Sequence, residues 1–160
     1  MTAKVAPLLV FGWGNPSRGD DALGPLLVEQ LADRAQALLP AGRLECLTDF
    51  QLQVEHALDL VGRERVLFVD AAIGLQTPFA VRTVLPAPVA GFTTHALAPE
   101  ALLQVYNELE RAEPPPCTLL AIRAQRFEFG EAPGEQALSD LAQALAWALA
   151  WAGLTEEMLT

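Results

Sequence analysis

Short apolar runs alternate with amphipathic segments along this chain of 160 residues. The apolar runs have the length of buried strands, and the segments between them repeat apolar residues at the steps of a helix face. The pattern predicts strands over Ala6–Phe11, Arg43–Thr48, Arg65–Asp70, Phe79–Leu85 and Cys117–Ala124. It predicts helices from about Gly24 to Pro40 and over Gln53–Val61, Ala98–Arg111 and Glu135–Ala152. This alternation is typical of an α/β fold with a largely parallel sheet, here in one domain over residues 1–160.

For two of the predicted elements, the sequence also indicates a position in the fold. Pro86 and Pro88 close the strand Phe79–Leu85, and because proline interrupts a hydrogen-bonded ladder, we expect this strand near an edge of the sheet. The last helix carries a predicted core stripe of Leu138, Leu141, Leu145 and Leu149. Trp147 and Trp151 lie on a different face, where they either cover the sheet or the 126–134 loop, or form an exposed patch for a partner.

Composition narrows the classes of function. Apolar residues make up 52% of the chain and charged residues 19%, which predicts a packed core rather than disorder. The net charge of −10 argues against a nucleic-acid partner, which requires a basic surface. No apolar run approaches the ~20 residues that span a membrane, and nothing resembles a signal peptide. We therefore expect a cytoplasmic protein without nucleic-acid or membrane partners, whose Cys46 and Cys117 are reduced core thiols.

The first strand leads directly into a glycine-rich loop, Gly12-Trp13-Gly14-Asn15-Pro16-Ser17-Arg18-Gly19-Asp20-Asp21-Ala22-Leu23-Gly24. Glycines after a strand usually let backbone N–H groups approach a phosphate. Here Asp20 and Asp21 occupy the place that a phosphate would need, and Ser17 replaces the third glycine of the nucleotide-binding pattern. Because these carboxylates repel an anion, the loop favours a metal ion or a basic group over a nucleotide.

Polar residues also follow the other predicted strands. Asp49 comes after the second strand, Asp70 ends the third, and His95 lies in the loop after the fourth. The carboxyl ends of parallel strands form the ligand crevice of an open α/β sheet. We therefore expect Asp21, Asp49, Asp70 and His95 at one edge of the sheet, where two carboxylates and an imidazole would suit a divalent metal such as nickel or zinc.

Each of these residues also has a purely structural interpretation. Asp20 or Asp21 can cap the first helix, and Asp49 can cap the second. His95 can belong to the start of the third helix, and His56 is a surface or half-buried helix residue. Asp70 is harder to explain as a cap, because it follows four buried apolar residues.

Familiar hydrolytic motifs are missing from the sequence. The two serines, Ser17 and Ser139, do not lie in a G-x-S-x-G turn. There is no H-E-x-x-H and no C-x-x-C. The candidate catalytic groups that remain are therefore carboxylates and imidazoles.

The motifs resemble those of the [NiFe]-hydrogenase maturation proteases over nearly the whole chain. The resemblance rests on the loop from Gly12 to Gly24, on Val69-Asp70-Ala71-Ala72, and on Thr94-His95 before a helix. It implies a single-domain, three-layer sandwich with a twisted, mostly parallel five-stranded sheet between helices. It also implies that Asp21, Asp70 and His95 contact nickel and carry out catalysis.

The resemblance further implies a cytoplasmic, monomeric endopeptidase. Its substrate is the hydrogenase large-subunit precursor, from which it removes a C-terminal extension once nickel is installed. Three ligands are too few to close a structural site, so we expect the free enzyme to bind nickel weakly and to meet the ion in the precursor. A non-catalytic nickel-sensing chaperone with the same ligands is the alternative, and a small nucleotide-binding regulator is a third reading that Asp20-Asp21 disfavours.

One segment departs from the family pattern. Many members carry Asp-Gly-Gly-Thr after the second strand, whereas this chain has Asp49-Phe50-Gln51-Leu52-Gln53. The stretch Thr48–Asp59 resembles the subgroup that serves NAD-linked bidirectional hydrogenases. The roles of Gln51, Glu55 and His56 therefore stay open at the level of sequence.

Overall fold

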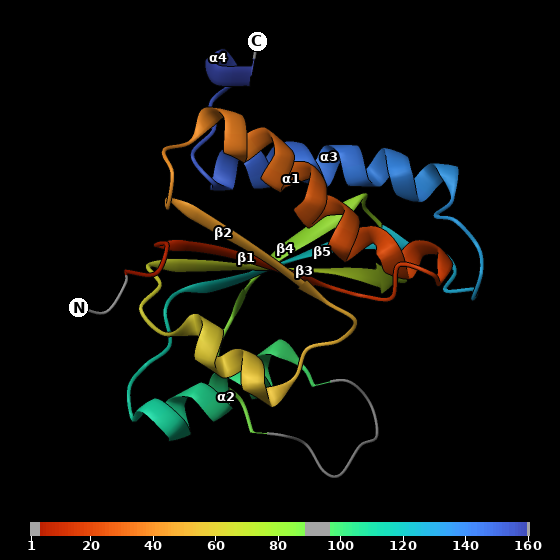
Figure 1. Ribbon diagram of the computed structural model, residues 1–160. Coiled ribbons are helices and arrows are strands. Elements are labelled where there is room, and N and C mark those ends of the chain that lie inside the picture. The colour runs from red at the N-terminus through yellow and green to blue at the C-terminus, as the bar shows by residue number, and fades with distance from the viewer. Residues whose placement is uncertain (1–3, 89–96, 160) are drawn as a thin grey trace.

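Five strands form one sheet in the order β2-β1-β3-β5-β4 in the computed structural model, which describes residues 4–88 and 97–159 (Figure 1). The strands are β1 (Leu8–Trp13), β2 (Leu44–Asp49), β3 (Arg65–Ile73), β4 (Phe79–Val84) and β5 (Cys117–Ala124). The strand β4 pairs antiparallel with β5, and the other pairs are parallel. The sheet is mostly parallel, as predicted, and the proline-closed strand lies at its edge.

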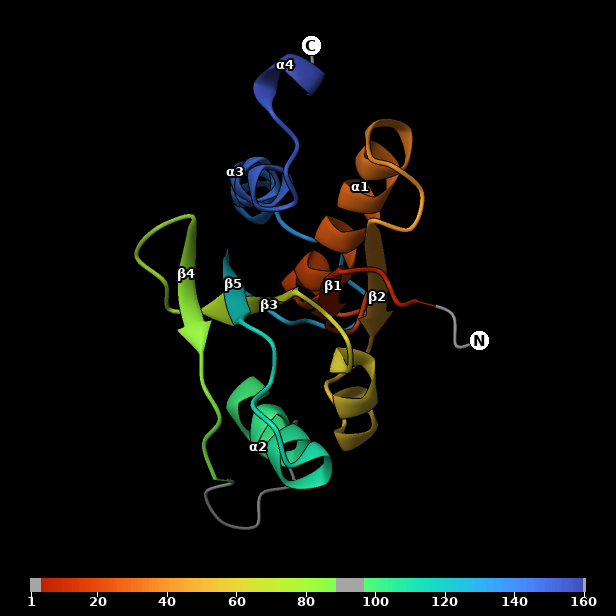
Figure 2. The same cartoon turned by 90° about the vertical axis from the view of Figure 1, so that its left-hand side faces the viewer.

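Helices cover both faces of the sheet. They are α1 (Leu23–Leu38), α2 (Pro99–Glu110), α3 (Glu135–Trp151), α4 (Glu156–Leu159) and two 3₁₀ segments, η1 (Gly19–Ala22) and η2 (Val54–Leu60). In Figures 1 and 2, α1 and α3 lie on one face, and α2 and the yellow segment η2 lie on the other. The predicted three-layer α/β sandwich is therefore confirmed.

Alternate residues of the strands supply two cores. In β1, Val10 packs with α1 and α3, whereas Leu9 and Phe11 pack with η2 and α2. In β3, Leu67 and Val69 belong to the first core, and Val66, Phe68 to the second. Successive side chains of a strand point to opposite faces, so a central strand covered on both sides is apolar throughout. This is why the continuous apolar runs predicted the strands correctly.

The segment predicted as a helix over Gln53–Val61 is a 3₁₀ helix instead. Its buried residues are Ala57 and Leu60, while Val54 and Leu58 are exposed. Burial at a three-residue step matches the three-residue turn of a 3₁₀ helix. An α-helix would need a wider apolar stripe than this segment offers.

The last helix follows its predicted range, but its core stripe is shorter than predicted. Leu141, Leu145 and Leu149 are buried, whereas Leu138 is 45% exposed, because Ala137 rather than Leu138 faces the core in the first turn of α3. Trp147 and Trp151 are partly buried and pack against the core, and the guanidinium of Arg65 stacks 4.7 Å from the Trp151 ring centroid. The two tryptophans therefore cover the sheet and do not form an exposed patch.

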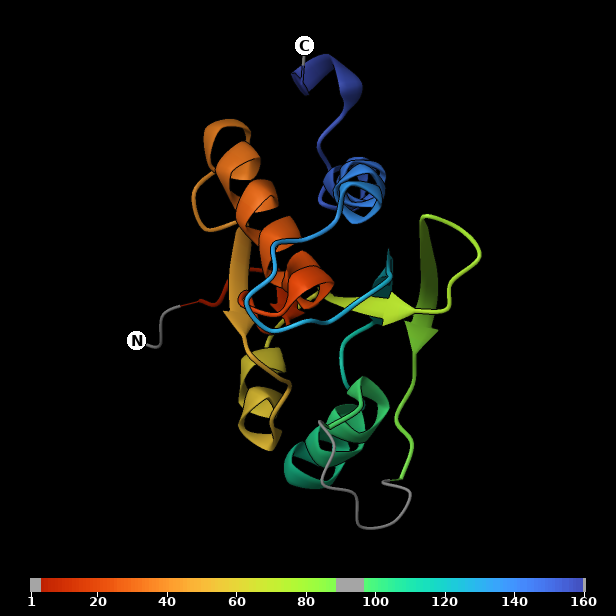
Figure 3. The same ribbon diagram turned by 90° about the vertical axis from the view of Figure 1, so that its right-hand side faces the viewer.

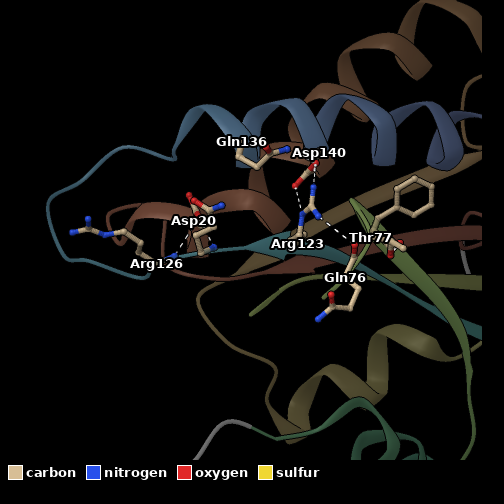
Figure 4. Close-up of polar contacts among 9 residues, drawn as sticks. Asp20, Gln76, Thr77, Arg123, Arg126, Gln136 and Asp140 are labelled. Atoms are coloured by element: carbon tan, nitrogen blue, oxygen red, sulfur yellow. Dashed lines mark hydrogen bonds and ion pairs between the residues drawn. The ribbon is translucent and has the colours of Figure 1, made fainter. Parts of the chain in front are cut away.

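An ion pair between the partly exposed Arg123 and the buried Asp140 fixes α3 to the sheet (Figure 4). Arg123 of β5 donates from Nε and Nη2 to the two carboxylate oxygens of Asp140, at 2.9 and 3.1 Å. Asp140 is fully buried and also accepts a hydrogen bond from Gln136. Arg123 reaches the carbonyl of Gln76 as well, so this pair joins α3, β5 and the β3–β4 connection.

The cysteines are free thiols, as expected. Burial raises the pKa of Cys46 to about 11 and that of Cys117 to about 12, so both are protonated and unreactive at neutral pH. Within residues 4–88 and 97–159, no helix has the length and apolar character needed to cross a bilayer.

Candidate active site

Asp21 and Asp70 line one pocket of about 350 Å³ at the carboxyl ends of the parallel strands. Figure 3 looks onto this edge of the molecule, where the blue connection between β5 and α3 passes the start of α1. The pocket is lined by Trp13, Asn15, Arg18, Asp21, Phe50, Gln51, Asp70, Ala71 and Phe127. The expectation that two carboxylates 49 positions apart meet at one sheet edge is thus met by the geometry.

Glycines in the loop allow α1 to begin directly on the sheet. A Cβ on Gly24 would lie 2.5 Å from the carbonyl oxygen of Trp13 and 2.9 Å from that of Val69. Gly14 has φ +147, and a Cβ there would lie 1.9 Å from the carbonyl oxygen of Asp21. A side chain at either position would push the loop away from the strands, so these glycines set where Asp21 stands.

The carboxylate of Asp70 is largely shielded from solvent. Its Oδ1 accepts a hydrogen bond from its neighbour Ala71 N–H at 2.8 Å. Burial raises the pKa of Asp70 to about 7, and the negative charge of Asp21 adds to this rise. The hydrogen bonds from Ala71 and the Trp13 side chain act in the opposite direction and do not cancel it. Burial and a nearby like charge both penalise the ionised form.

Asp21 is turned toward the glycine loop. Its Oδ2 accepts a hydrogen bond from the backbone N–H of Asn15 at 2.9 Å. The helix α1 begins at Leu23, and its N-cap residue Ala22 has no side-chain cap. The capping interpretation of Asp21 is therefore wrong, because this carboxylate orders the loop before the helix instead.

Asp20 has a purely structural setting, although it does not cap α1. It is 4% exposed, and its carboxylate accepts hydrogen bonds from the backbone N–H groups of Gln125, Arg126 and Gly134 at 2.8, 3.3 and 2.9 Å. Figure 4 shows Asp20 beside the segment that carries Arg126. Asp20 thus ties the connection between β5 and α3 to the glycine loop.

Asp49 and His56 form a pair at the same edge of the sheet. The Nε2 atom of His56 lies 3.2 Å from Oδ2 of Asp49, while Nδ1 accepts a hydrogen bond from Gln53 N–H at 2.8 Å. Nδ1 is therefore unprotonated, and Nε2–H donates to Asp49. Gln53 rather than Asp49 is the N-cap of η2, so the prediction of an Asp49 cap is wrong. His56 is half-buried, as expected.

His95 lies outside the described residues, so its placement beside Asp21 and Asp70 stays a prediction. Within the described part of the chain, no group of three or more His, Cys, Asp and Glu side chains is arranged to hold a metal ion. The pocket still fits a cation, because its two carboxylates supply oxygen ligands and the charge of one raises the pKa of the other. A cation between them would relieve that repulsion.

The residues of the pocket that the sequence did not single out include Trp13, Arg18 and Phe127. Trp13 lies between two glycines at the end of β1, and this aromatic residue inside the loop motif was an available signal. Arg18 lies in the same motif, but nothing in the spacing of the motif distinguishes it from its neighbours. Phe127 belongs to a segment of no regular structure, and its position depends on the contacts of Asp20, which no sequence pattern shows.

The chain is thus an α/β protein with a polar pocket at the carboxyl edge of a mostly parallel sheet. Solved structures of hydrogenase maturation proteases share its fold. The [NiFe]-hydrogenase maturation protease HycI from Thermococcus kodakarensis KOD1 is 21% identical, with a TM-score of 0.67, and the alignment covers 93% of this chain and 92% of that one. The hydrogenase maturating endopeptidase HybD from E. coli is 20% identical, with a TM-score of 0.68 and 90% of each chain covered.

A third similar structure is a hydrogenase 2 maturation peptidase from a Thaumarchaeota archaeon. It is 21% identical, with a TM-score of 0.62, and the alignment covers 92% of this chain and 99% of that one. No protein-family model matches the chain, and no curated protein matches it by sequence. At these identities the similarity establishes the fold.

Proposed function

We propose that this chain is an endopeptidase that removes the C-terminal extension of a [NiFe]-hydrogenase large-subunit precursor after nickel insertion. The observation that carries the proposal is the pocket shared by Asp21 and Asp70. It lies on a fold whose solved relatives are named hydrogenase maturation proteases and endopeptidases. The motif resemblance supplies the third residue, His95.

In this proposal nickel belongs to the substrate. Asp21, Asp70 and His95 contact the ion in the precursor and leave the remaining positions to the precursor's own ligands. Two carboxylates and an imidazole suit nickel but do not close a site, so the free enzyme binds the ion weakly. The bridging ion docks the precursor and fixes the peptide bond that is cut. Either a carboxylate or a metal-polarised water then attacks the carbonyl.

The finer parts of the proposal rest on the sequence. The stretch Thr48–Asp59 supports a hydrogenase of the NAD-linked bidirectional kind as the one served. A monomer in the cytoplasm is the working state that the family resemblance supports. The replacement of Asp-Gly-Gly-Thr by Asp49-Phe50-Gln51-Leu52-Gln53 also changes the wall of the pocket, since Phe50 and Gln51 line it.

The alternative is a chaperone that senses nickel through the same residues without cutting. Mass spectrometry of the nickel-loaded precursor after incubation with the protein separates the two functions. We expect a shortened large subunit and a released C-terminal peptide with the wild type. We expect neither with Asp21→Asn, and full processing with Asp33→Asn, which alters an exposed carboxylate of α1. A stable complex with an intact precursor would favour the chaperone.

A further inference from the structure

Arg18 is a cationic side chain in a pocket whose other lining residues include two carboxylates and three aromatic rings. It lines the same pocket as Asp21 and Asp70. No carboxylate of the described residues lies within ion-pair distance of its guanidinium, whereas the nearby Arg123 and Arg126 are paired with Asp140 and Glu131. Among the residues that the structure describes, the hydrogen bond of the Arg18 side chain is a long one, 3.4 Å, from Nη2 to the carbonyl of Phe127. Most of its N–H donors therefore have no partner within residues 4–88 and 97–159 and are available to a ligand.

The backbone that carries Arg18 is firmly held. Arg18 N–H donates to the carbonyl of Asn15 at 3.1 Å, and Arg18 accepts from Asp21 N–H at 3.0 Å. An antiparallel bridge pairs Arg18 with Phe129 of the β5–α3 connection, which the buried carboxylate of Asp20 holds in place. The side chain of Arg18 therefore extends from a fixed backbone position in the wall of the pocket that Asp21 and Asp70 also line.

Charge decides what this side chain can bind. An anionic side chain or phosphate in the pocket would meet Asp21 and Asp70, and in a protein of net charge −10 it would also be repelled at long range. A peptide carbonyl oxygen is neutral when it arrives and becomes negative only during attack. An arginine aimed at that oxygen stabilises the transition state more than the bound substrate, which is the condition for catalysis.

We propose that Arg18 donates hydrogen bonds to the oxygen of the scissile carbonyl and stabilises the oxyanion that forms there, an inference that rests on the proposed function. In the step with water as the nucleophile, the water oxygen bonds to the carbonyl carbon and its proton passes to a pocket carboxylate. The π electrons of the carbonyl move to its oxygen beside Arg18. When the C–N bond breaks, its electron pair stays on nitrogen, which takes the proton back.

The test is single-turnover cleavage of the nickel-loaded precursor at increasing enzyme concentration. This measurement separates the rate of cleavage from the affinity for the precursor. The variants are Arg18→Ala, Arg18→Gln and Arg18→Lys, and the matched control is Arg126→Ala. Arg126 lies on the adjacent segment outside the pocket, and its side chain makes an exposed ion pair with Glu131. Thermal melting establishes that each variant is folded.

Loss of a donor to an oxyanion lowers the rate of the chemical step by about 100-fold or more. We expect that loss for Arg18→Ala and Arg18→Gln with nearly unchanged affinity, a smaller loss for Arg18→Lys, and wild-type behaviour for Arg126→Ala. Weaker binding with an unchanged cleavage rate would overturn the oxyanion role, as would full activity of Arg18→Ala. If the wild type does not cut, the proposed function fails, and this inference with it.

Discussion

Asp20 and Asp21 are adjacent in sequence, yet they have different surroundings and different consequences on substitution. The buried carboxylate of Asp20 accepts three backbone hydrogen bonds, and an amide in its place cannot accept all three. We expect Asp20→Asn to destabilise the protein by about 3 kcal/mol. Asp21→Asn keeps an acceptor for Asn15 and leaves the melting temperature near that of the wild type while processing is lost. Thermal denaturation of both variants, with a processing assay, checks this contrast; equal stability of the two would contradict it.

Asp70 makes the folding stability of the protein depend on pH, and the sign of this dependence follows from its raised pKa. The pKa of Asp70 rises from an ordinary value of 3.8 to about 7 on folding, so the folded state holds the proton more tightly than the unfolded state. This contribution to stability is present below about pH 4 and is lost as the pH rises toward 7. Above pH 7 the folded state carries a buried charge that costs up to about 4 kcal/mol.

Removing the charge of Asp70 should therefore stabilise the free protein at high pH. We expect Asp70→Asn to raise the melting temperature relative to the wild type at pH 8 and to change it little at pH 4. Asp33→Asn is the control, because the carboxylate of Asp33 is exposed to solvent on α1. A variant that is equally destabilised at both pH values would show that Asp70 supports the fold instead.

Residues whose partners come from their own loop or strand were easier to interpret than those whose partners do not. Asp70 follows a buried apolar strand, and this was enough to predict its place at the sheet edge. Asp20 looked like a helix cap, because its three partners lie in the segment 125–134, more than a hundred positions away. The position of Phe127 in the pocket follows from these contacts, so the sequence did not reveal it.

At the scale of the elements, the contact between α3 and β5 offers a direct test of how the layers are joined. Arg123→Ala would leave the carboxylate of Asp140 buried without its cation, so we expect a clear loss of stability. Arg82→Ala removes an ion pair with Glu100 that is open to solvent and should cost less than about 1 kcal/mol. Urea denaturation of the two variants measures the difference. A small loss of stability in Arg123→Ala would show that this ion pair does not hold α3 on the sheet.

Element boundaries were predictable where burial imposed a clear period. The range Cys117–Ala124 is the same in the prediction and the structure, because this strand is apolar and sits between stiff prolines and a loop. The 3₁₀ geometry of Val54–Leu60 was missed, because seven residues with two buried positions do not separate the two helix types. The sequence pattern also did not predict that β4 runs antiparallel to β5. The prolines after β4 indicate an edge strand, but an edge strand can run in either direction.

At the scale of the whole molecule, the order of elements and the sites at strand ends explain why function could be approached from sequence. A mostly parallel sheet gathers its loops at one edge, so Asp21 and Asp70 meet in one pocket. The chemistry of that pocket required the structure, because Trp13, Arg18 and Phe127 complete it. The third predicted ligand, His95, remains a prediction of the sequence.

The central claim is that nickel in the precursor, rather than a metal ion resident in the enzyme, licenses cleavage. Its most direct test compares nickel-loaded and nickel-free precursor under matched conditions, with the metal content of the purified enzyme measured alongside. We expect release of the C-terminal peptide from the loaded precursor alone, and an enzyme that carries far less than one nickel per chain. Equal cleavage rates on the two precursors would contradict the account.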